Sequence, residues 1–311
     1  MNSILRRTSG LQAVDILIIA FAFLLSIIIL IAAGGGTPSS SLIATNAVAS
    51  CSVIGLAYRA AKTGNRALRA IHDWYPVPVI FLVFKEIHEI IHLFGSRDWD
   101  SIFIEIDRAT FTVDPTVWLG RFAHPFVTET LQIAYASYYF IMLTVAVELF
   151  VRKDKHEFSF VLFTIVYGFF LSYLGYITFP AVGPRFTIHT FTTLSTDLPG
   201  VMFTDWIRDV LNAGESIPRD GVNAFVLAQR DAFPSGHTQM TLISLYLAFH
   251  YHLKSTWMLT IFGTLLIIGT VYLRYHYVID LVGGALFMMF TVWTAPKLFV
   301  WWEGDQMGDG R

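Results

Sequence analysis

The sequence predicts an all-α membrane protein, a polytopic helical bundle that crosses the bilayer about eight times. Of its 311 residues, 55% are hydrophobic and 14% are charged, whereas a soluble domain carries about 25% charged residues. Several apolar runs approach or exceed the roughly 20 residues with which a helix spans a bilayer. The lysines of the connecting loops fall on alternate loops, as the positive-inside rule requires of a multi-pass protein.

The N-terminal third contains three predicted spans. The first apolar run, 13–33, is longer than a signal-peptide core of about 7–15 residues, so we expect it to be retained as a helix. The third, 74–94, ends in the sequence KEIHEIIH, whose polar residues must face the protein interior or a wet cavity. Between them the run 41–61 predicts the second span, and a basic loop follows it with Arg59, Lys62, Arg66 and Arg69.

The remaining elements follow from the same reading. Between 95 and 125, acidic and apolar residues recur at helical spacing, which predicts one or two short amphipathic helices at the membrane interface. The segment 181–233 is too long for a simple connector, because loops of more than about 15 residues usually cover a site or form a lid. Further spans are predicted at 127–150 and 158–179, from Pro234 onward, at 256–274 and at 279–301.

Charge asymmetry orients these spans. If Arg6 and Arg7 are cytoplasmic, the basic clusters 59–69 and 152–155 are cytoplasmic as well. The loops on the opposite side, 34–40, 95–126 and 181–233, contain no lysine. We therefore expect an integral multi-pass protein of an inner or plasma membrane, with the segment 181–233 on its non-cytoplasmic side.

In this topology three polar clusters reach the non-cytoplasmic surface. The sequence FPAVGPRF, where one helix ends, contains Arg185, and FPSGH, where the next begins, contains Ser235, Gly236 and His237. The sequence LRYHYVID, between the last two helices, contains Arg274, His276 and Asp280. Segments that are distant in sequence therefore place arginines, histidines and a carboxylate at the same depth in the membrane.

The histidines suit nucleophilic and acid–base catalysis. His276 and Asp280 are four residues apart and share one face of a helix. A carboxylate on one imidazole nitrogen fixes the tautomer and makes the other nitrogen a better nucleophile. His237 is the candidate general acid for a leaving alkoxide. Alone, His276 and Asp280 would fit a structural interfacial pair equally well, but the coincidence of three clusters favours catalysis.

The other residues suit a phosphate. Pro234 is expected at the first helical position, so that the amides of Ser235, Gly236 and His237 point at an anion. Gly236 would let the anion approach the backbone. The plainer interpretation of FPSGH is an ordinary helix start with a capping serine. Arg185 and Arg274 are expected to hold phosphoryl oxygens, and no metal ligand set accompanies the clusters, so we expect no metal or other cofactor.

On these motifs the sequence resembles the type 2 phosphatidic acid phosphatase superfamily over roughly 75–300. PSGH at 234–237 matches that family's pattern, and so does H-x3-D at His276 and Asp280. The resemblance implies that His276 is a phosphohistidine nucleophile, that Asp280 is its partner and that His237 acts first as acid and then as base. GPR at 183–185 and RYHYVIDLVGG are similar to the branch with inositol phosphorylceramide synthases and bacterial homologues.

Two positions depart from the family's pattern. Thr270 stands where the third motif has its arginine, and Thr178 stands where the first motif has its lysine. Whether Arg274 replaces the missing arginine is therefore open. The resemblance also divides the chain into N-terminal transmembrane helices (1–72), a phosphatase-like membrane domain with a six-helix core (73–302) and a polar tail (303–311).

The predicted function is a membrane lipid phosphatase or phosphotransferase that acts on a phospholipid or other lipid phosphate. The motifs do not distinguish water from a lipid or sugar hydroxyl as acceptor, so a head-group transferase like inositol phosphorylceramide synthase is the alternative. The membrane bilayer is the other expected partner. Nothing in the composition indicates nucleic-acid binding, and the sequence leaves the oligomeric state open.

The sequence HEIIH at 88–92 supports a competing hypothesis. His88 and His92 share a helix face and could bind zinc with Glu89 as base, as in an intramembrane metalloprotease. This is less favoured, because no matching third ligand is found. A plainer interpretation is a buried polar network that includes Lys85 and Glu86. A transporter that relays protons through its histidines is a third hypothesis, against which PSGH at a helix start argues.

Overall fold

The computed structural model describes residues 10–33, 39–95, 97–215, 217–218 and 221–304, and all regular structure in these residues is helical. This confirms the predicted all-α class. Arg6 and Arg7, residues 34–38 after the first predicted helix and the tail from residue 305 lie outside the described residues.

Four of the described helices are long and apolar enough to span a membrane, and a bent helix pair makes a fifth if it is counted as one span. The four are α2 (Ala13–Ala32), α3 (Ser40–Thr63), α10 (Lys155–Thr178) and α17 (Val278–Glu303). Three further helices lie where spans were predicted but are shorter or more polar, namely α5 (Pro76–Phe94), α15 (Gly236–His250) and α16 (Thr256–Tyr272). The chain is a multi-pass membrane protein, and the count of eight spans stays a prediction.

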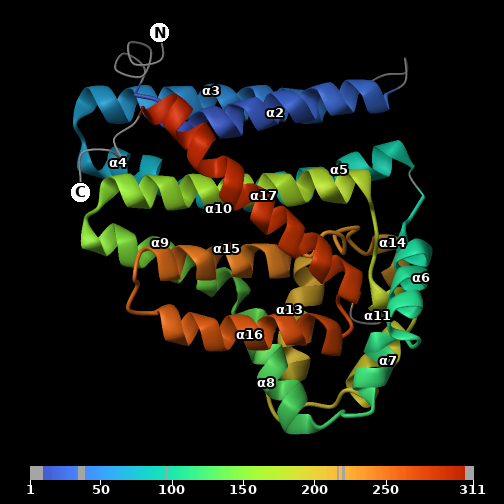
Figure 1. Ribbon diagram of the computed structural model, residues 1–311. Helices are drawn as coiled ribbons and strands as arrows, with labels where there is room; N and C mark the ends of the chain where they lie inside the picture. The colour runs from blue at the N-terminus through green and yellow to red at the C-terminus, as the bar shows by residue number, and fades with distance from the viewer. Residues whose placement is uncertain (1–9, 34–38, 96, 216, 219–220, 305–311) are drawn as a thin grey trace. The chain divides into compact units, whose positions relative to one another are not determined.

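Contacts divide the chain into two compact units, of which the first comprises Met1–Gly95, Leu149–Phe170 and Phe290–Arg311. In this unit α2 packs against both α3 and α5 (Figure 1). The predicted basic loop before α5 is wrong, because Arg59 and Lys62 lie in α3 and its second half is the helix α4 (Arg66–Trp74). Asn65 begins α4, since its side-chain oxygen accepts from the amides of Ala67 (2.8 Å) and Leu68 (3.4 Å). The division of the chain at residues 72 and 302 stays a prediction.

Buried carboxylates join the helices of the first unit. Asp15 of α2 is fully buried and accepts hydrogen bonds from His72 Nε2 (2.9 Å) and from the Tyr75 hydroxyl (2.5 Å). Glu86 of α5 accepts one from the side-chain amide of Asn46 in α3 (2.6 Å). A carboxylate stays buried only where such donors satisfy it. Glu86 thus belongs to a buried polar contact, whereas Lys85 is exposed, so the buried network expected for KEIHEIIH holds for Glu86 and not for Lys85.

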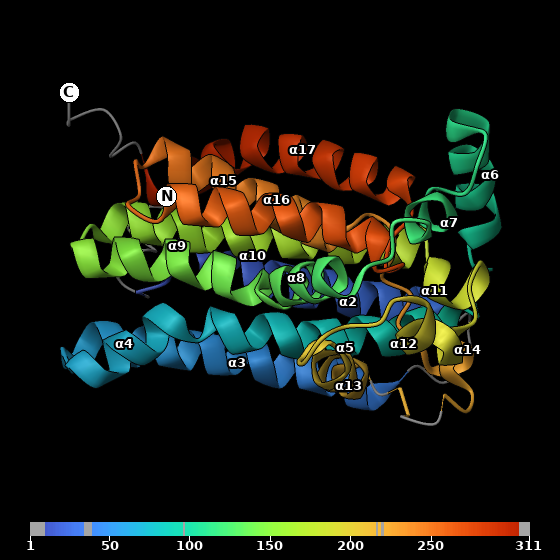
Figure 2. The same cartoon turned by 90° about the horizontal axis from the view of Figure 1, so that it is seen from below.

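The second unit comprises Ser96–Glu148 and Leu171–Met289. It opens with α6 (Asp100–Phe111) and α7 (Pro115–Gly120), which confirms two short helices in the range 95–125. Their position at the membrane interface stays a prediction. In this unit α16 packs against α7, α8 and α15, and α15 and α16 run side by side in Figure 2.

The predicted single helix 127–150 is wrong, because it is broken into α8 (Pro125–Ala136) and α9 (Tyr138–Arg152), bent by 46°. Ser137 stands at the break, and its hydroxyl donates to the carbonyl of Ala134 (2.6 Å). A serine hydroxyl that bonds the preceding turn competes with the helical backbone and bends it. The break places Tyr135 and Tyr138, one on each side, against the same histidine ring of the site described below.

The long segment 181–233 is folded. It contains α11 (Pro184–Thr187), η1 (Phe191–Thr193), α12 (Leu194–Asp197), α13 (Thr204–Gly214) and α14 (Ala224–Leu227). Glu129 of α8 anchors it, because its carboxylate accepts from the amides of Val201 (2.9 Å) and Phe203 (2.6 Å) at the start of α13. A carboxylate at a helix N-terminus also complements the helix dipole.

Candidate active site

Three turns of the second unit carry the predicted site residues: α11, the start of α15, and the turn between α16 and α17. Helix α6 ties two of these turns together. The buried carboxylate of Asp100 accepts from the amides of Val182 (3.0 Å) and Gly183 (2.9 Å) and from the Tyr277 hydroxyl (2.8 Å). Hydrogen bonds to a charged acceptor are among the stronger ones, so α6 holds the turn of Arg185 beside the turn of His276.

Gly183 allows these two turns to touch. Its φ of +90° lies in the region that favours glycine, and a Cβ there would lie 2.6 Å from the carbonyl oxygen of Tyr275. Any other residue would therefore separate Arg185 from the loop that carries His276. The glycine of GPR serves the contact between turns.

His276 is held as a neutral imidazole with one free nitrogen. Its Nδ1 lies 2.9 Å from the carbonyl oxygen of Ala232 and 3.3 Å from Oδ2 of Asp280. Two acceptors at Nδ1 place the ring proton there, which leaves the lone pair on Nε2. Asp280 is itself fully buried and also accepts from the Tyr277 amide (2.8 Å).

His237 faces this lone pair. Its Nδ1 lies 3.4 Å from Nε2 of His276. The ring of His237 lies against two tyrosine rings, with centroid distances of 4.4 Å to Tyr135 and 4.2 Å to Tyr138. The aromatic walls fix the orientation of His237, so the two imidazoles meet nitrogen to nitrogen.

The expectation that Pro234 begins the helix is wrong. Helix α15 begins at Gly236, and Ser235 is its N-cap, whose hydroxyl accepts from the Thr238 amide (3.2 Å). The Ser235 amide is also used, since it donates to the carbonyl of Asp280 (2.9 Å). Ser235 therefore caps α15 and joins two motifs. Of the three amides that were expected to point at an anion, those of Gly236 and His237 stay available to a phosphate in the described part of the chain.

Gly236 packs against a tyrosine. A Cβ at Gly236 would collide with the hydroxyl of Tyr176 in α10. Its carbonyl accepts from the Tyr138 hydroxyl (3.2 Å). The packing of α15 against tyrosines thus also requires a small residue here, and the approach of an anion to the Gly236 backbone stays a prediction.

Arg185 lies beside the histidines, buried between rings. Its guanidinium carbon is 4.6 Å from the ring centroid of Phe186 and 4.8 Å from that of Tyr275, and the Tyr275 ring stacks on Tyr135. The guanidinium is ion-paired with Glu215 and also donates to the side-chain oxygen of Asn212 (3.4 Å). Arg185 thus presents an anion-binding group that already holds a carboxylate.

The side chain of Arg274 contacts other residues than that of Arg185 does. It adopts a φ of +69°, and its guanidinium donates to Asp197 of α12 (2.7 Å). Thr270, where the family has an arginine, is fully buried, and its carbonyl accepts from the amides of Tyr275 (2.9 Å) and His276 (3.0 Å). The structure therefore brings Arg185 together with both histidines and Asp280, and directs Arg274 to Asp197. A phosphate-binding role for Arg274 stays a prediction.

Two carboxylates near His276 were not among the predicted site residues: Asp231 and Glu215. Burial, together with the charge of the nearby Glu215, raises the pKa of Asp231 to about 6. Burial lowers the pKa of His276 to about 4, against the opposing charge of Asp231. His276 is therefore neutral at physiological pH, as a nucleophile must be.

Sequence signals exist for some of these missed residues. Asp231 stands three residues before PSGH, and Tyr135 and Tyr138 are three apart in the aromatic-rich run. Glu215 carries no such signal, because it is one acid among several in a long segment. Only the fold of 181–233 shows that it reaches Arg185.

The HEIIH residues lie in the first unit, on α5. Nδ1 of His92 lies 2.8 Å from the carbonyl oxygen of His88. Within the described ranges no three His, Cys, Asp or Glu side chains are grouped so that they could hold a metal ion. The third ligand of the metalloprotease hypothesis is thus not found among these residues.

Parts of the chain are similar to known proteins. The model of the PAP2 superfamily matches residues 102–294. A 72-residue stretch is 33% identical to the bacitracin transport permease protein BcrC of Bacillus licheniformis and covers 22% of this chain and 36% of that protein. No solved structure matches. The branch with inositol phosphorylceramide synthases stays a prediction, but the family match covers more than half of the chain, and the chain belongs to the PAP2 superfamily.

Proposed function

We propose that the chain is an integral-membrane phosphatase or phosphotransferase that acts on a phosphorylated lipid through a phosphohistidine at His276. Members of the PAP2 superfamily are generally phosphatases or phosphotransferases, which supports a membrane phosphatase-type function. The observation that carries the proposal is the pair of imidazoles. Nδ1 of His276 is held by Ala232 and Asp280, and its Nε2 faces His237 at 3.4 Å.

In the first step Nε2 of His276 attacks phosphorus, and the bond from phosphorus to the lipid oxygen breaks. The electron pair of that bond stays on the leaving oxygen, which takes a proton from His237. A bound phosphate places negative charge beside His237, which favours its protonated form. The charge that develops on the ring of His276 is compensated by Asp280 at Nδ1.

In the second step His237 acts as base. It takes a proton from water or from an acceptor hydroxyl, whose oxygen attacks the phosphorus of the phosphohistidine. The P–N bond breaks, and its electron pair returns to Nε2 of His276. Arg185 and the amides of Gly236 and His237 are the groups that would hold the phosphoryl oxygens in both steps.

Glu215 would compete with phosphate for Arg185. The guanidinium pairs with this carboxylate, which comes from the C-terminal end of α13. The segment 181–233 thus supplies Arg185, Asn212 and Glu215 to the site itself. This observation favours a site that contacts the substrate head group or an acceptor through that segment, and makes the head-group transferase the second candidate.

The test is a measurement of phosphate release against phosphoryl transfer by the purified protein. It is offered lipid phosphates and phosphatidylinositol, each with and without ceramide or diacylglycerol. Free phosphate that is insensitive to acceptor identifies a hydrolase. A phosphorylated acceptor that forms only when the acceptor is present identifies a transferase. Turnover of neither kind would overturn the proposal.

A further inference from the structure

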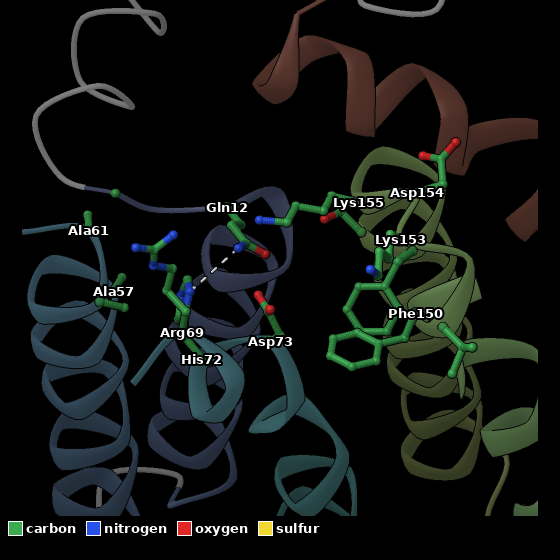
Figure 3. A pocket seen from close by; sticks show the side chains of 15 residues that line it. Gln12, Ala57, Ala61, Arg69, His72, Asp73, Phe150, Lys153, Asp154 and Lys155 are labelled. Atoms are coloured by element: carbon green, nitrogen blue, oxygen red, sulfur yellow. Dashed lines mark hydrogen bonds between the residues drawn. The ribbon is translucent and has the colours of Figure 1, made fainter. Parts of the chain in front are cut away.

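Two basic clusters of the first unit surround one cavity. Its volume is about 700 Å³, and its walls come from α3, α4, the turn between α9 and α10, and the residues that precede α2. Figure 3 shows the ammonium of Lys155, the carboxylate of Asp73 and the amide of Gln12 converging on it. Arg69 and Lys153 also line it. These cations belong to the clusters 59–69 and 152–155, which the lysine distribution assigns to the cytoplasmic side.

The polar side of the cavity is fixed by buried groups. His72 and Gln12 line it, and Nδ1 of His72 lies 3.5 Å from Nε2 of Gln12. Behind them the fully buried Asp15 accepts from His72 Nε2 (2.9 Å) and from the Gln12 backbone amide (2.7 Å). This network sets the His72 tautomer and the position of Gln12 before any ligand arrives, which lowers the entropy lost on binding.

Positive charge exceeds negative charge around the cavity. Arg69, Lys153 and Lys155 line it, and none of them forms an ion pair with a residue in the described part of the chain. Of the two lining acids, Asp154 is engaged as the cap of α10, since its carboxylate accepts from the Glu157 amide (3.1 Å). The other, Asp73, is half-buried, and burial raises its pKa.

The opposite side of the cavity is apolar. Ala57, Ala60 and Ala61 present a smooth face of α3, and Phe150, Val151 and Phe158 close it from the α9–α10 side. Helices α3 and α10 are candidate membrane spans. The cavity therefore combines a cationic rim with a wall that suits hydrocarbon.

We propose that this cavity is a binding site for an anionic phospholipid, distinct from the catalytic histidines. Arg69, Lys153 and Lys155 would hold the phosphate of the head group, Gln12 and Asp73 would bond its hydroxyls, and the alanine face would take an acyl chain. Basic pockets between transmembrane helices on the cytoplasmic side recognise anionic head groups in this way. Arginine adds a planar fork that matches two phosphate oxygens.

Charge argues against occupation by the chain's own N-terminus. The nine residues before Gly10 contain Arg6 and Arg7 and no acidic residue. That segment would bring two further positive charges to a rim that is already cationic. An external anion is the complementary occupant.

The test compares two triple variants of the full-length protein in a neutral detergent. The first, Arg69→Gln with Lys153→Gln and Lys155→Gln, removes the cations that line the cavity. The matched control, Arg59→Gln with Lys62→Gln and Arg66→Gln, removes the same number of charges from residues that do not line it. Binding of dioleoyl phosphatidylglycerol, dioleoyl phosphatidylcholine and sn-glycerol 3-phosphate is measured by native mass spectrometry and by the shift in melting temperature.

The wild type is expected to bind phosphatidylglycerol and not phosphatidylcholine. Each lost cation should weaken binding about fivefold, so the cavity triple should lose about 100-fold and the control triple under about fivefold. Equal losses in the two triples would overturn the proposal in favour of diffuse surface attraction. Glycerol phosphate that binds as tightly as the lipid would overturn the lipid assignment.

A single substitution tests the same site in case the triple variant does not fold. Lys155→Glu changes one exposed side chain and reverses one charge, so it should by itself weaken binding of phosphatidylglycerol about 25-fold. Both cavity variants should keep wild-type turnover of a water-soluble phosphate ester, because none of these residues lies among the candidate catalytic groups. Unchanged lipid binding in Lys155→Glu would contradict the site, whether or not the catalytic proposal holds.

Discussion

His276 and His237 stand 39 residues apart in the chain, and their ring nitrogens Nε2 and Nδ1 lie 3.4 Å from each other. The turn before α17 supplies one ring and the first turn of α15 supplies the other. A phosphate bound beside this pair would offer its phosphorus to one imidazole and its ester oxygen to the other. The proposed division of labour between nucleophile and acid follows from this geometry.

His237→Gln should slow departure of a poor leaving group much more than departure of a good one. General acid catalysis contributes about 10²–10⁴-fold when the leaving alkoxide needs a proton. A nitrophenolate leaves without one. Single-turnover release should therefore fall by about this factor for a lipid phosphate and far less for p-nitrophenyl phosphate. Equal losses on both substrates would assign His237 another role.

Glu215→Gln should tighten inhibition by inorganic phosphate about tenfold, which corresponds to about 1.4 kcal/mol. The charged carboxylate competes with phosphate for the Arg185 guanidinium, and glutamine competes less. Arg185 should stay in place, because the rings of Phe186 and Tyr275 also hold it.

The matched control for Glu215 is Asp205→Asn. This acid lies on the same helix, is 71% exposed and is paired with Arg208 instead of Arg185. Its inhibition constant for phosphate should equal that of the wild type. Weaker inhibition in Glu215→Gln would mean that the carboxylate positions Arg185 for phosphate and does not compete with it.

Asp231 should make anion binding depend on pH. Burial raises the pKa of Asp231 to about 6, so this group gains its negative charge as pH rises through about 6. Burial lowers the pKa of His276 to about 4, so His276 is already neutral across that interval. Sulfate, whose charge is constant there, should bind more weakly by about threefold to tenfold as pH rises. Asp231→Asn should flatten this profile, and an unchanged profile would contradict the assignment.

Cysteine labelling should place the segment 181–233 on the non-cytoplasmic side, as its lack of lysine predicts. Met202 is 74% exposed and precedes α13, so Met202→Cys should react with an impermeant maleimide in intact cells. The native Cys51 is exposed as well and must first be replaced by serine. Reaction only after the membrane is permeabilised would place the segment on the cytoplasmic side and contradict the prediction.

The sequence predicted those parts of the site that depend on short-range spacing. His276 and Asp280 are four apart and their side chains are in contact as predicted, although His276 lies in the turn before α17 and does not share a helix face with Asp280. The lengths of α10 and α17 follow from continuous apolar runs. Three clusters at helix ends could be assigned to one site because consecutive spans alternate in direction.

Other features depend on contacts between distant segments. Glu215 reaches Arg185 only through the fold of α13, and α13 is held by Glu129 from α8. Arg274 is closer in sequence to His276 than Arg185 is, yet its guanidinium is hydrogen-bonded to Asp197. The break at Ser137 could not be predicted from the sequence, because serine is common inside helices and bends few of them.

The phosphohistidine at His276 is the central claim, and trapping it tests the claim most directly. The purified protein is mixed with a ³²P-labelled lipid phosphate, quenched in alkali and analysed for protein-bound label that acid releases. Wild-type protein should carry the label, and His276→Ala should carry none and show no turnover. Label or turnover that persists in His276→Ala would contradict the mechanism.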